Sequence, residues 1–543
     1  MARKKAICII LTFILVVCGL SGCGSTKTSS LELNLALGAA PTTADPQLQA
    51  DTTSASVTSL FTAGLYEYDE NGKIAPCLAE GFDLSEDGCT YTFHLKKDLK
   101  WSDGRPLTAQ DFVFALRRFA DPNVGSNSVY LITDCCTIKN AKEVSTGKKP
   151  INELGVSSPD KDTFVVELEE PCPFFCEMTS LGNFSPCNEE FYHSVGDDYA
   201  AQAKSILSCG PYIIDRYEPL PVQIHYTKNP YFCMADKIKV EGINLQVIED
   251  NQQKMMCYET GLMDVVSVSG ELAELHKDSP ELHVFPSATT YCIDVNTRTC
   301  DALKNKNIRM ALSKSIDRED ITTNLMKSGF TALTRAIPTE FYYEQDGSDF
   351  AKDTDMYKAY AGYDPEEAQK LWKQGLSELG VSEISLNFLY SSTNSAQCEA
   401  IASYMEKNLP GLKIELLSKS MKDVIQAKSN GGYDLLFNGW AADYADPTSF
   451  LGQYISDATV VGYNNPDYDA VYKQTMSSEM AKDAGERNKL LHKLEDMVME
   501  DAGIIPIFSK GENFMIREGV DGFLLTPHGD DYIVTGLTVK ERR

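Results

Sequence analysis

Residues 438–451 of this chain read Asn-Gly-Trp-Ala-Ala-Asp-Tyr-Ala-Asp-Pro-Thr-Ser-Phe-Leu. The stretch Tyr433–Phe437 just before them follows two glycines and is mostly apolar, which is typical of a buried strand. Trp440 and Asp443 therefore lie where this strand ends, and α/β sheets bind their ligands at the carboxyl ends of strands. The stretch predicts an α/β fold with a ligand site at this position.

Trp440 and Asp443 together suit a small cationic group. A carboxylate accepts charge-assisted hydrogen bonds from an ammonium group at roughly 1.5–3 kcal/mol, and an indole face adds about 0.5–2 kcal/mol where water is excluded. A purely structural interpretation is also open, in which Trp440 is a core aromatic residue and Asp443 caps the turn before Pro447. The local pattern alone leaves both interpretations standing.

The first residues predict export from the cell. A positive segment, Arg3–Lys5, precedes the apolar segment Ala6–Leu20, which is too short for a comfortable membrane span. We therefore assign residues 1–22 to a signal peptide. The ending Leu20-Ser21-Gly22-Cys23 resembles a bacterial lipobox, which implies cleavage before Cys23 and a diacylglycerol on its thiol. Residues 23–30 would then be the lipidated cysteine and a flexible tether, although an ordinary secretory signal with a fortuitous cysteine is the alternative.

Length and composition describe a large, acidic, folded protein. A chain of 543 residues is too long for one core and predicts two or three lobes. A hydrophobic fraction of 43% excludes global disorder, and a net charge of −28 argues against a nucleic-acid partner. No stretch after the signal peptide is long and apolar enough to cross a bilayer.

The sequence carries no recognisable catalytic or metal motif. It lacks the Gly-x-Ser-x-Gly elbow, His-Glu-x-x-His, the Walker phosphate loop and Gly-x-Gly-x-x-Gly. Its seven histidines are scattered, and no Cys-x-x-Cys occurs among its 16 cysteines. An odd number of cysteines remains after the signal peptide and Cys23, so not all of them pair internally, and we expect buried thiols. We predict a protein that is not an enzyme and that has no metal and no cofactor.

A second informative block lies nearer the amino end. Tyr91, Phe93 and Leu95 alternate with polar residues as in a half-buried strand, and Thr108 and Asp111 have the spacing of a capping box before a helix. The string Leu99–Phe112 reads Leu-Lys-Trp-Ser-Asp-Gly-Arg-Pro-Leu-Thr-Ala-Gln-Asp-Phe. This string, together with the Gly-Trp-x-x-Asp-Tyr-x-x-Pro-Thr-Ser-Phe-Leu string quoted first, resembles the dipeptide- and oligopeptide-binding lipoproteins of bacterial ABC importers, extracellular solute-binding protein family 5.

The resemblance extends over nearly the whole mature chain and implies its architecture. It implies a two-lobed α/β fold of the periplasmic-binding-protein type II, with an additional inserted lobe and a hinge between the lobes. We expect a discontinuous lobe I, an inserted lobe and an opposing lobe. Lobe I takes residues 31–68, 205–286 and 503–543, the inserted lobe takes 69–204, and the opposing lobe takes 287–502.

The resemblance also implies a function. Members capture peptides in the cleft between the lobes and deliver them to a permease, on the outer face of the cytoplasmic membrane when they are lipid-anchored. By this resemblance Asp443 holds the peptide's α-ammonium group, with Trp440 beside it. An extended peptide would pair its backbone with a segment of each lobe, so that Ala40 and Pro41 on one side and Gly439 and Ala441 on the other become ligand-binding residues. We expect a monomer.

One departure from the family bears on the ligand. Position 437 is Phe, whereas some oligopeptide-binding members have an arginine there that meets a peptide carboxylate. Arg309 and Arg335 are other possible carboxylate partners, and each is equally a candidate packing residue. Other ligands stay open, because family members also bind sugars, nickel complexes or glutathione. A peptide-sensing surface receptor that does not transport is a further alternative.

Overall fold

A computed structural model describes residues 31–540 except 218–222, 328, 457–461 and 528–530. The predicted signal peptide, Cys23 and the tether lie outside the described residues. Of the thirteen cysteines in the described part, every one is a free thiol. No helix in the described ranges is long and apolar enough to cross a membrane.

One large mixed sheet runs through the molecule, so the α/β class predicted from the sequence is confirmed. It has 11 strands, ten of them on one path, while β13 (Phe330–Ala332) pairs with β17 beside that path. The path is β15 (Leu412–Lys419), β14 (Ile384–Ser391), β16 (Leu435–Ala441), β12 (Leu282–Val295), β17 (Ile504–Ile516), β11 (Val265–Val268), β1 (Glu32–Leu37), β10 (Gly242–Val247), β9 (Gln223–Lys228) and β8 (Tyr212–Arg216).

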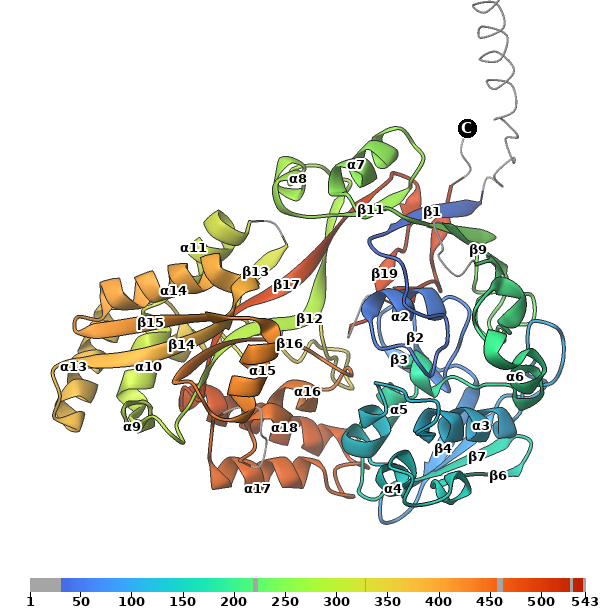
Figure 1. The fold of residues 1–543 in the computed structure, drawn as a ribbon, viewed down its shortest axis with the longest axis horizontal. Coiled ribbons are helices and arrows are strands. Elements are labelled where there is room, and N and C mark those ends of the chain that lie inside the picture. Colours follow the sequence, from blue (N-terminus) through green and yellow to red (C-terminus); the bar gives the residue numbers. More distant parts are fainter. Residues whose placement is uncertain (1–30, 218–222, 328, 457–461, 528–530, 541–543) are drawn as a thin grey trace, which may run out of the picture.

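The long strands β12 and β17 join the two halves of this sheet (Figure 1). Leu282–Pro286 of β12 pairs with residues of β17 near β11, and Thr290–Asp294 pairs with residues near β16, with a register shift between the two segments. Such a shift locally interrupts the ladder and bends the strand. The lobes are therefore connected through an irregular ribbon of β12 and β17, beside which β13 pairs with β17 at Phe508–Lys510.

The position of this ribbon bears on one predicted lobe boundary. Ile505, Ile507 and Phe508 of β17 pack in the hydrophobic core of the opposing lobe. Because the pairing of β17 with β11 begins only at Asn513, we propose that the chain returns to lobe I after Ser509 rather than at residue 503. The other predicted lobe boundaries stay predictions.

The inserted segment forms its own small sheet. Its strand order is β4 (Ala79–Leu84), β5 (Thr90–Leu95), β7 (Thr163–Glu167) and β6 (Val156–Asp160). The capping box predicted before the first long helix is present, since the amide N–H of Thr108 donates to Asp111 Oδ2 at 2.7 Å. Trp101 and Phe112 of this segment share one continuous hydrophobic core with Leu35 of β1. Lobe I and the inserted lobe are therefore packed as a single body.

Helices cover the sheets and complete the three regions. Lobe I and the inserted lobe carry α2 (Thr52–Thr58), α3 (Ala109–Ala120), the π-helix Leu131–Cys135, α4 (Ala141–Ser145), α5 (Phe175–Met178), α6 (Glu189–Val195), α7 (Asn251–Glu259) and α8 (Gly270–Leu275). The opposing lobe carries α9 (Asp301–Lys304), α10 (Lys306–Lys314), α11 (Arg318–Asp320), α12 (Lys358–Ala361), α13 (Pro365–Leu379), α14 (Ser395–Asn408), α15 (Met421–Ser429), α16 (Thr448–Leu451), α17 (Pro466–Thr475) and α18 (Ala484–Glu500). Two-residue and three-residue strands complete the fold as the pairs β2 (Tyr66–Tyr68) with β3 (Ile74–Pro76), β18 (Val520–Asp521) with β21 (Thr538–Val539), and β19 (Leu524–Leu525) with β20 (Tyr532–Ile533).

Candidate ligand-binding site

The strand β16 is paired on both sides only over its first half. Leu435 and Leu436 pair with β14 on one side and with β12 on the other. From Asn438 to Ala441 the described residues pair with β12 alone, and both Gly439 and Ala441 are exposed. The free side of this segment offers backbone N–H and C=O groups to an extended chain.

Gly439 is needed for the packing of this segment. It lies opposite Tyr291 of β12, and a Cβ atom at this position would come within 2.7 Å of the Tyr291 ring. A side chain at position 439 would therefore force the ring away, and glycine allows close approach of backbone and ring. Tyr291 in turn stacks on Phe437 with ring centroids 5.6 Å apart, so Phe437 is part of the core.

Trp440 is half-buried at the end of β16. Its ring packs against the opposing lobe's core cluster that contains Ala442 and Phe450. The indole N–H is buried and has no hydrogen-bond acceptor in the described part of the chain. Because buried polar groups are nearly always hydrogen-bonded, this donor is a reason to look for a ligand beside Trp440.

Asp443 accepts a hydrogen bond from a residue of the inserted lobe. The hydroxyl group of Tyr130, which directly precedes the π-helix Leu131–Cys135, donates to Asp443 Oδ1 at 2.9 Å. Burial raises the pKa of the Asp443 carboxyl group, and the hydrogen bond from Tyr130 opposes that shift. An ionised carboxylate accepts several hydrogen bonds, so Asp443 keeps capacity for a ligand donor.

The alternative that Asp443 caps the turn before Pro447 is wrong, because the side chain of Asp446 caps this turn. Asp446 Oδ1 accepts the amide N–H of Thr448 at 3.0 Å, and its carboxylate also binds Arg487 at 2.6 and 2.9 Å. Burial alone would raise the pKa of Asp446, but Arg487 lowers it below its ordinary value. Asp443 is thus free of the capping role that would otherwise explain it.

Aromatic packing holds the same turn against the inserted lobe. Tyr444 stacks on Phe174 with ring centroids 4.2 Å apart and ring planes only 5° from parallel. The amide N–H of Asp443 donates to the Ser449 hydroxyl at 3.0 Å, which fixes the backbone on the other side. Asp443 is therefore presented from a rigid turn at the contact between two lobes.

The structure does not bring Ala40 and Pro41 next to β16. Both follow β1 in lobe I, where Ala40 is exposed and Pro41 is buried. The strands β12, β17 and β11 lie between β1 and β16, which corresponds to about 19 Å at the usual strand spacing. Of the predicted site residues, only those of the 439–443 segment lie together.

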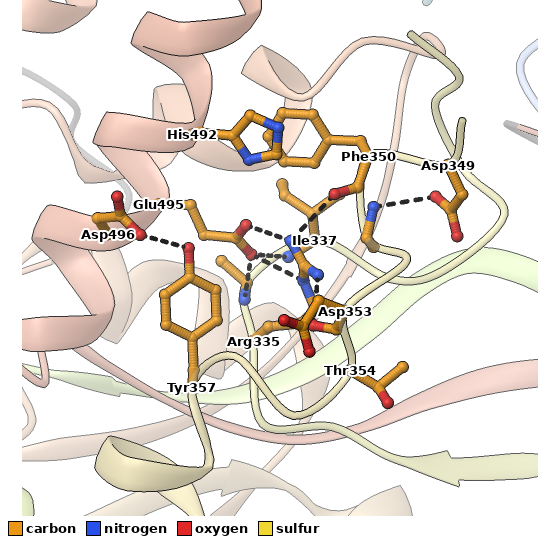
Figure 2. Close-up of polar contacts among 12 residues, drawn as sticks. Arg335, Ile337, Asp349, Phe350, Asp353, Thr354, Tyr357, His492, Glu495 and Asp496 are labelled. Atoms are coloured by element: carbon orange, nitrogen blue, oxygen red, sulfur yellow. Dashed lines mark hydrogen bonds and ion pairs between the residues drawn. The ribbon is translucent and has the colours of Figure 1, made fainter. Parts of the chain in front are cut away.

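The two arginines considered as carboxylate partners are both bound within the chain. Figure 2 shows Arg335 beside Glu495, whose Oε2 lies 2.5 Å from Arg335 Nη2. Glu495 also accepts the amide N–H groups of Ala336 and Ile337, each at 3.0 Å. Arg309 donates to the carbonyl oxygens of residues 303 and 304 and to Asp501. Neither guanidinium group is available to a ligand in this form.

Tyr130 was not found from the sequence. It lies 313 residues from Asp443 along the chain, and no local pattern marks it. Only the folded arrangement of the inserted lobe places its hydroxyl group on the carboxylate.

The described residues contain no cluster of three or more His, Cys, Asp and Glu side chains that could hold a metal ion.

Comparison with known proteins identifies the family. Residues 73–460 match the model of the bacterial extracellular solute-binding proteins, family 5, middle region. The chain belongs to this family. Its members are solute-binding proteins of ABC importers that act outside the cytoplasmic membrane. Among curated relatives, a dipeptide-binding protein of Lactococcus lactis is 27% identical over 560 residues, which is 99% of this chain and all of that protein.

Solved structures confirm the two-lobed type II fold. The peptide-bound OppA of Listeria monocytogenes is 29% identical and superposes with a TM-score of 0.67, covering 94% of this chain and 99% of that one. The unliganded open form of the murein tripeptide binding protein MppA superposes with a TM-score of 0.83, at 24% identity and with 95% and 98% coverage. Both superpositions cover nearly the whole of each chain and show the same fold.

We expect Arg335→Leu to destabilise the opposing lobe without any ligand being involved. The change leaves the Glu495 carboxylate buried without its counter-charge, which costs about 3–5 kcal/mol of unfolding free energy. Adding Glu495→Gln removes that charge and keeps an acceptor for the two amides, so the double variant should recover part of the loss. Urea unfolding measures both, and Arg216→Leu, at an exposed position, is the control. Wild-type stability of Arg335→Leu would contradict this account.

Proposed function

We propose that this protein captures short peptides between its lobes and delivers them to the permease of an ABC importer. The observation that carries the proposal is the unpaired side of Asn438–Ala441, which leads directly to the carboxylate of Asp443. Membership of the solute-binding family and the coverage of the peptide-binding relatives support it. The protein acts by binding, with neither catalysis nor a cofactor.

The amino end of the peptide is held at Asp443. The ligand's α-ammonium group donates to the carboxylate, and the face of Trp440 covers it where water is excluded. Tyr130 already donates to Asp443 Oδ1, so it keeps the carboxylate oriented and ionised before the ligand arrives. A free amino terminus is thereby the feature that all ligands share.

The backbone of the peptide is held independently of its sequence. Gly439 and Ala441 pair with one side of the extended ligand, and Ala40 and Pro41 approach its other side when lobe I closes. The ribbon of β12 and β17 is the hinge for this rotation, because both strands run from one half of the sheet into the other. The closed, liganded form is the one that the permease recognises.

The protein is tethered to the outer face of the cytoplasmic membrane. The sequence before Leu31 supports a signal peptide, a diacylglyceryl group on Cys23 and a short tether. A tethered monomer stays near the permease, which raises its effective concentration there.

We expect the affinity for peptides to depend on both members of the ammonium–carboxylate pair. Acetylating the peptide's amino end, or changing Asp443→Ala, should weaken binding about tenfold to a hundredfold, because a charged hydrogen bond of roughly 1.5–3 kcal/mol is lost. Calorimetric titration of the tether-free protein, refolded to remove bound ligand, measures this. Asp467→Asn, an exposed aspartate in the first turn of α17, is the matched control. Equal binding of free and acetylated peptides would rule out the anchor.

The same carboxylate should make binding sensitive to acid. Burial raises the pKa of Asp443, and only the ionised form attracts the ammonium group, so affinity is full at neutral pH and is lost as the pH falls through this raised pKa. The loss begins above the ordinary aspartate range, which is centred near about 3.9. Tyr130→Phe removes the hydrogen bond that lowers the pKa, so its titration midpoint should move to higher pH. Titration calorimetry of both proteins at a series of pH values decides this, and a midpoint that does not move contradicts it.

The proposed lipid anchor is attached through one thiol, that of Cys23. In cells that express Cys23→Ser, we expect the protein to move from the membrane fraction to the medium or periplasm, because the sulfur that carries the lipid is gone. Immunoblots of the separated fractions measure this. Cys89→Ser, which changes a partly exposed cysteine of the folded domain, is the control and should stay with the membrane. Retention of Cys23→Ser in the membrane fraction would overturn the anchor.

A further inference from the structure

A buried acid lies behind the strand that carries the site. Asp294 of β12 is fully buried, pairs with Leu436 of β16, and its carboxylate oxygens have no hydrogen-bond partner at normal geometry in the described part of the chain. Burial raises its pKa to about 7, while Lys428 and the Asn438 amide favour its charged form. A buried carboxylate of this kind needs a nearby positive charge.

Lys428, in the last turn of α15, supplies this positive charge. Lys428 Nζ donates to Asn438 Oδ1 at 3.2 Å, and Asn438 lies in the segment of β16 that does not pair with β14. Burial lowers the pKa of Lys428 and Asp294 counteracts this. No ion pair within 4.0 Å joins Lys428 to any described residue, and a lysine has three N–H donors, of which Asn438 takes one. The ammonium group is therefore held in place and still able to donate.

We propose that Lys428 binds the carboxylate at the far end of the peptide, with Asp294 and Asn438 as its positioning residues. The inference rests on the proposed function and extends it, because it names the group that receives the second end of the ligand. Lys428 contacts Asn438 at the start of the unpaired segment of β16, and Asp443 follows its end, so one binds the carboxyl end and the other the amino end. The peptide then runs antiparallel to β16.

The buried arginines of the opposing lobe do not fit this role. Arg309, Arg318, Arg335 and Arg487 are all nearly fully buried and donate to groups of the protein itself. Phe437 packs in the core and points away from Asn438, since successive side chains of a strand face opposite sides. The position that holds an arginine in some relatives is thus apolar here, and Lys428 supplies a charge from the neighbouring helix instead.

The geometry sets the length of the ligand. Asn438 and Asp443 are five positions apart, which is at most about 16 Å of chain at roughly 3.3 Å per residue, because β16 ends at Ala441 and Asp443 lies in the turn beyond it. A peptide whose two charged ends match that span has about four or five residues. Shorter peptides reach only one of the two charges, and longer ones must bend or carry their carboxylate past Lys428.

Titration calorimetry with alanine-rich peptides of two to seven residues tests the proposal. Each peptide is used as the free acid and as the carboxyl-terminal amide, both with a free amino end. For the wild-type protein we expect affinity to peak at four or five residues and to fall about tenfold on amidation, as for the loss of one charged hydrogen bond. For Lys428→Met we expect acids and amides to bind alike, with no peak in length.

Two further variants make the result specific. Lys428→Arg keeps the charge and should preserve the preference for the acid, and Lys422→Met, an exposed lysine on the same helix, should behave as wild type. Unfolding midpoints of all variants are compared, because a change in binding with unchanged stability excludes misfolding. If Lys428→Met keeps the wild-type ratio of acid to amide affinity, the proposal is overturned. Failure of the proposed function is separate, since it would remove the effect of amino-terminal acetylation in the wild-type protein.

Discussion

The antiparallel ladder between β12 and β17 is the constraint on which this structure depends. It carries the sheet from lobe I into the opposing lobe, and the register shift after Pro286 interrupts it where the lobes meet. A two-stranded ribbon with an irregularity resists bending far less than a packed core does. Because the inserted lobe shares its core with lobe I, the molecule has two bodies rather than three. In the proposed function this ribbon is therefore the hinge, and closure about it encloses the ligand between the two bodies.

The site follows from where strand pairing stops. β14 pairs with β16 only through Leu436 and continues to Ser391 beside β15, while β12 continues beside β16 to Ala441. The exposed backbone that results would be a liability on an ordinary sheet edge, because it invites another strand. Here the edge leads to Asp443, which is held by the stacking of Tyr444 on Phe174 and reached by Tyr130. Contacts across the lobes thus hold the Asp443 carboxylate in place, and in the proposed function this charge orients the peptide along the edge.

Local sequence patterns predicted local features, and contacts between distant segments could not be predicted. The capping box at Thr108, the first strand and the position of Asp443 after a buried strand were correct, because each depends on neighbours within a few residues. The sequence did not identify Tyr130 and Lys428, because their contacts with Asp443 and Asn438 form only when the chain folds. The later crossing of β17 that we propose rests on the packing of Ile505, Ile507 and Phe508, which an apolar pattern alone does not assign to either lobe. Family resemblance supplied the topology that the patterns lacked.

Some buried charged side chains of this protein are bonded to an opposite charge within the chain, and others have no such bond among the described residues. Arg335 with Glu495 and Arg487 with Asp446 are buried, mutually bonded pairs that fix loops, and replacing such a pair as a unit often costs little. Asp294 is different, because burial deprives it of water and the described residues offer it no direct bond. Natural folds seldom keep a group in that state unless something compensates it. Lys428 compensates it in part, and a ligand carboxylate bound to Lys428 would favour the charged lysine that Asp294 needs. The lack of a hydrogen-bond partner for Asp294 among the described residues therefore supports placing the carboxyl end of the ligand at Lys428.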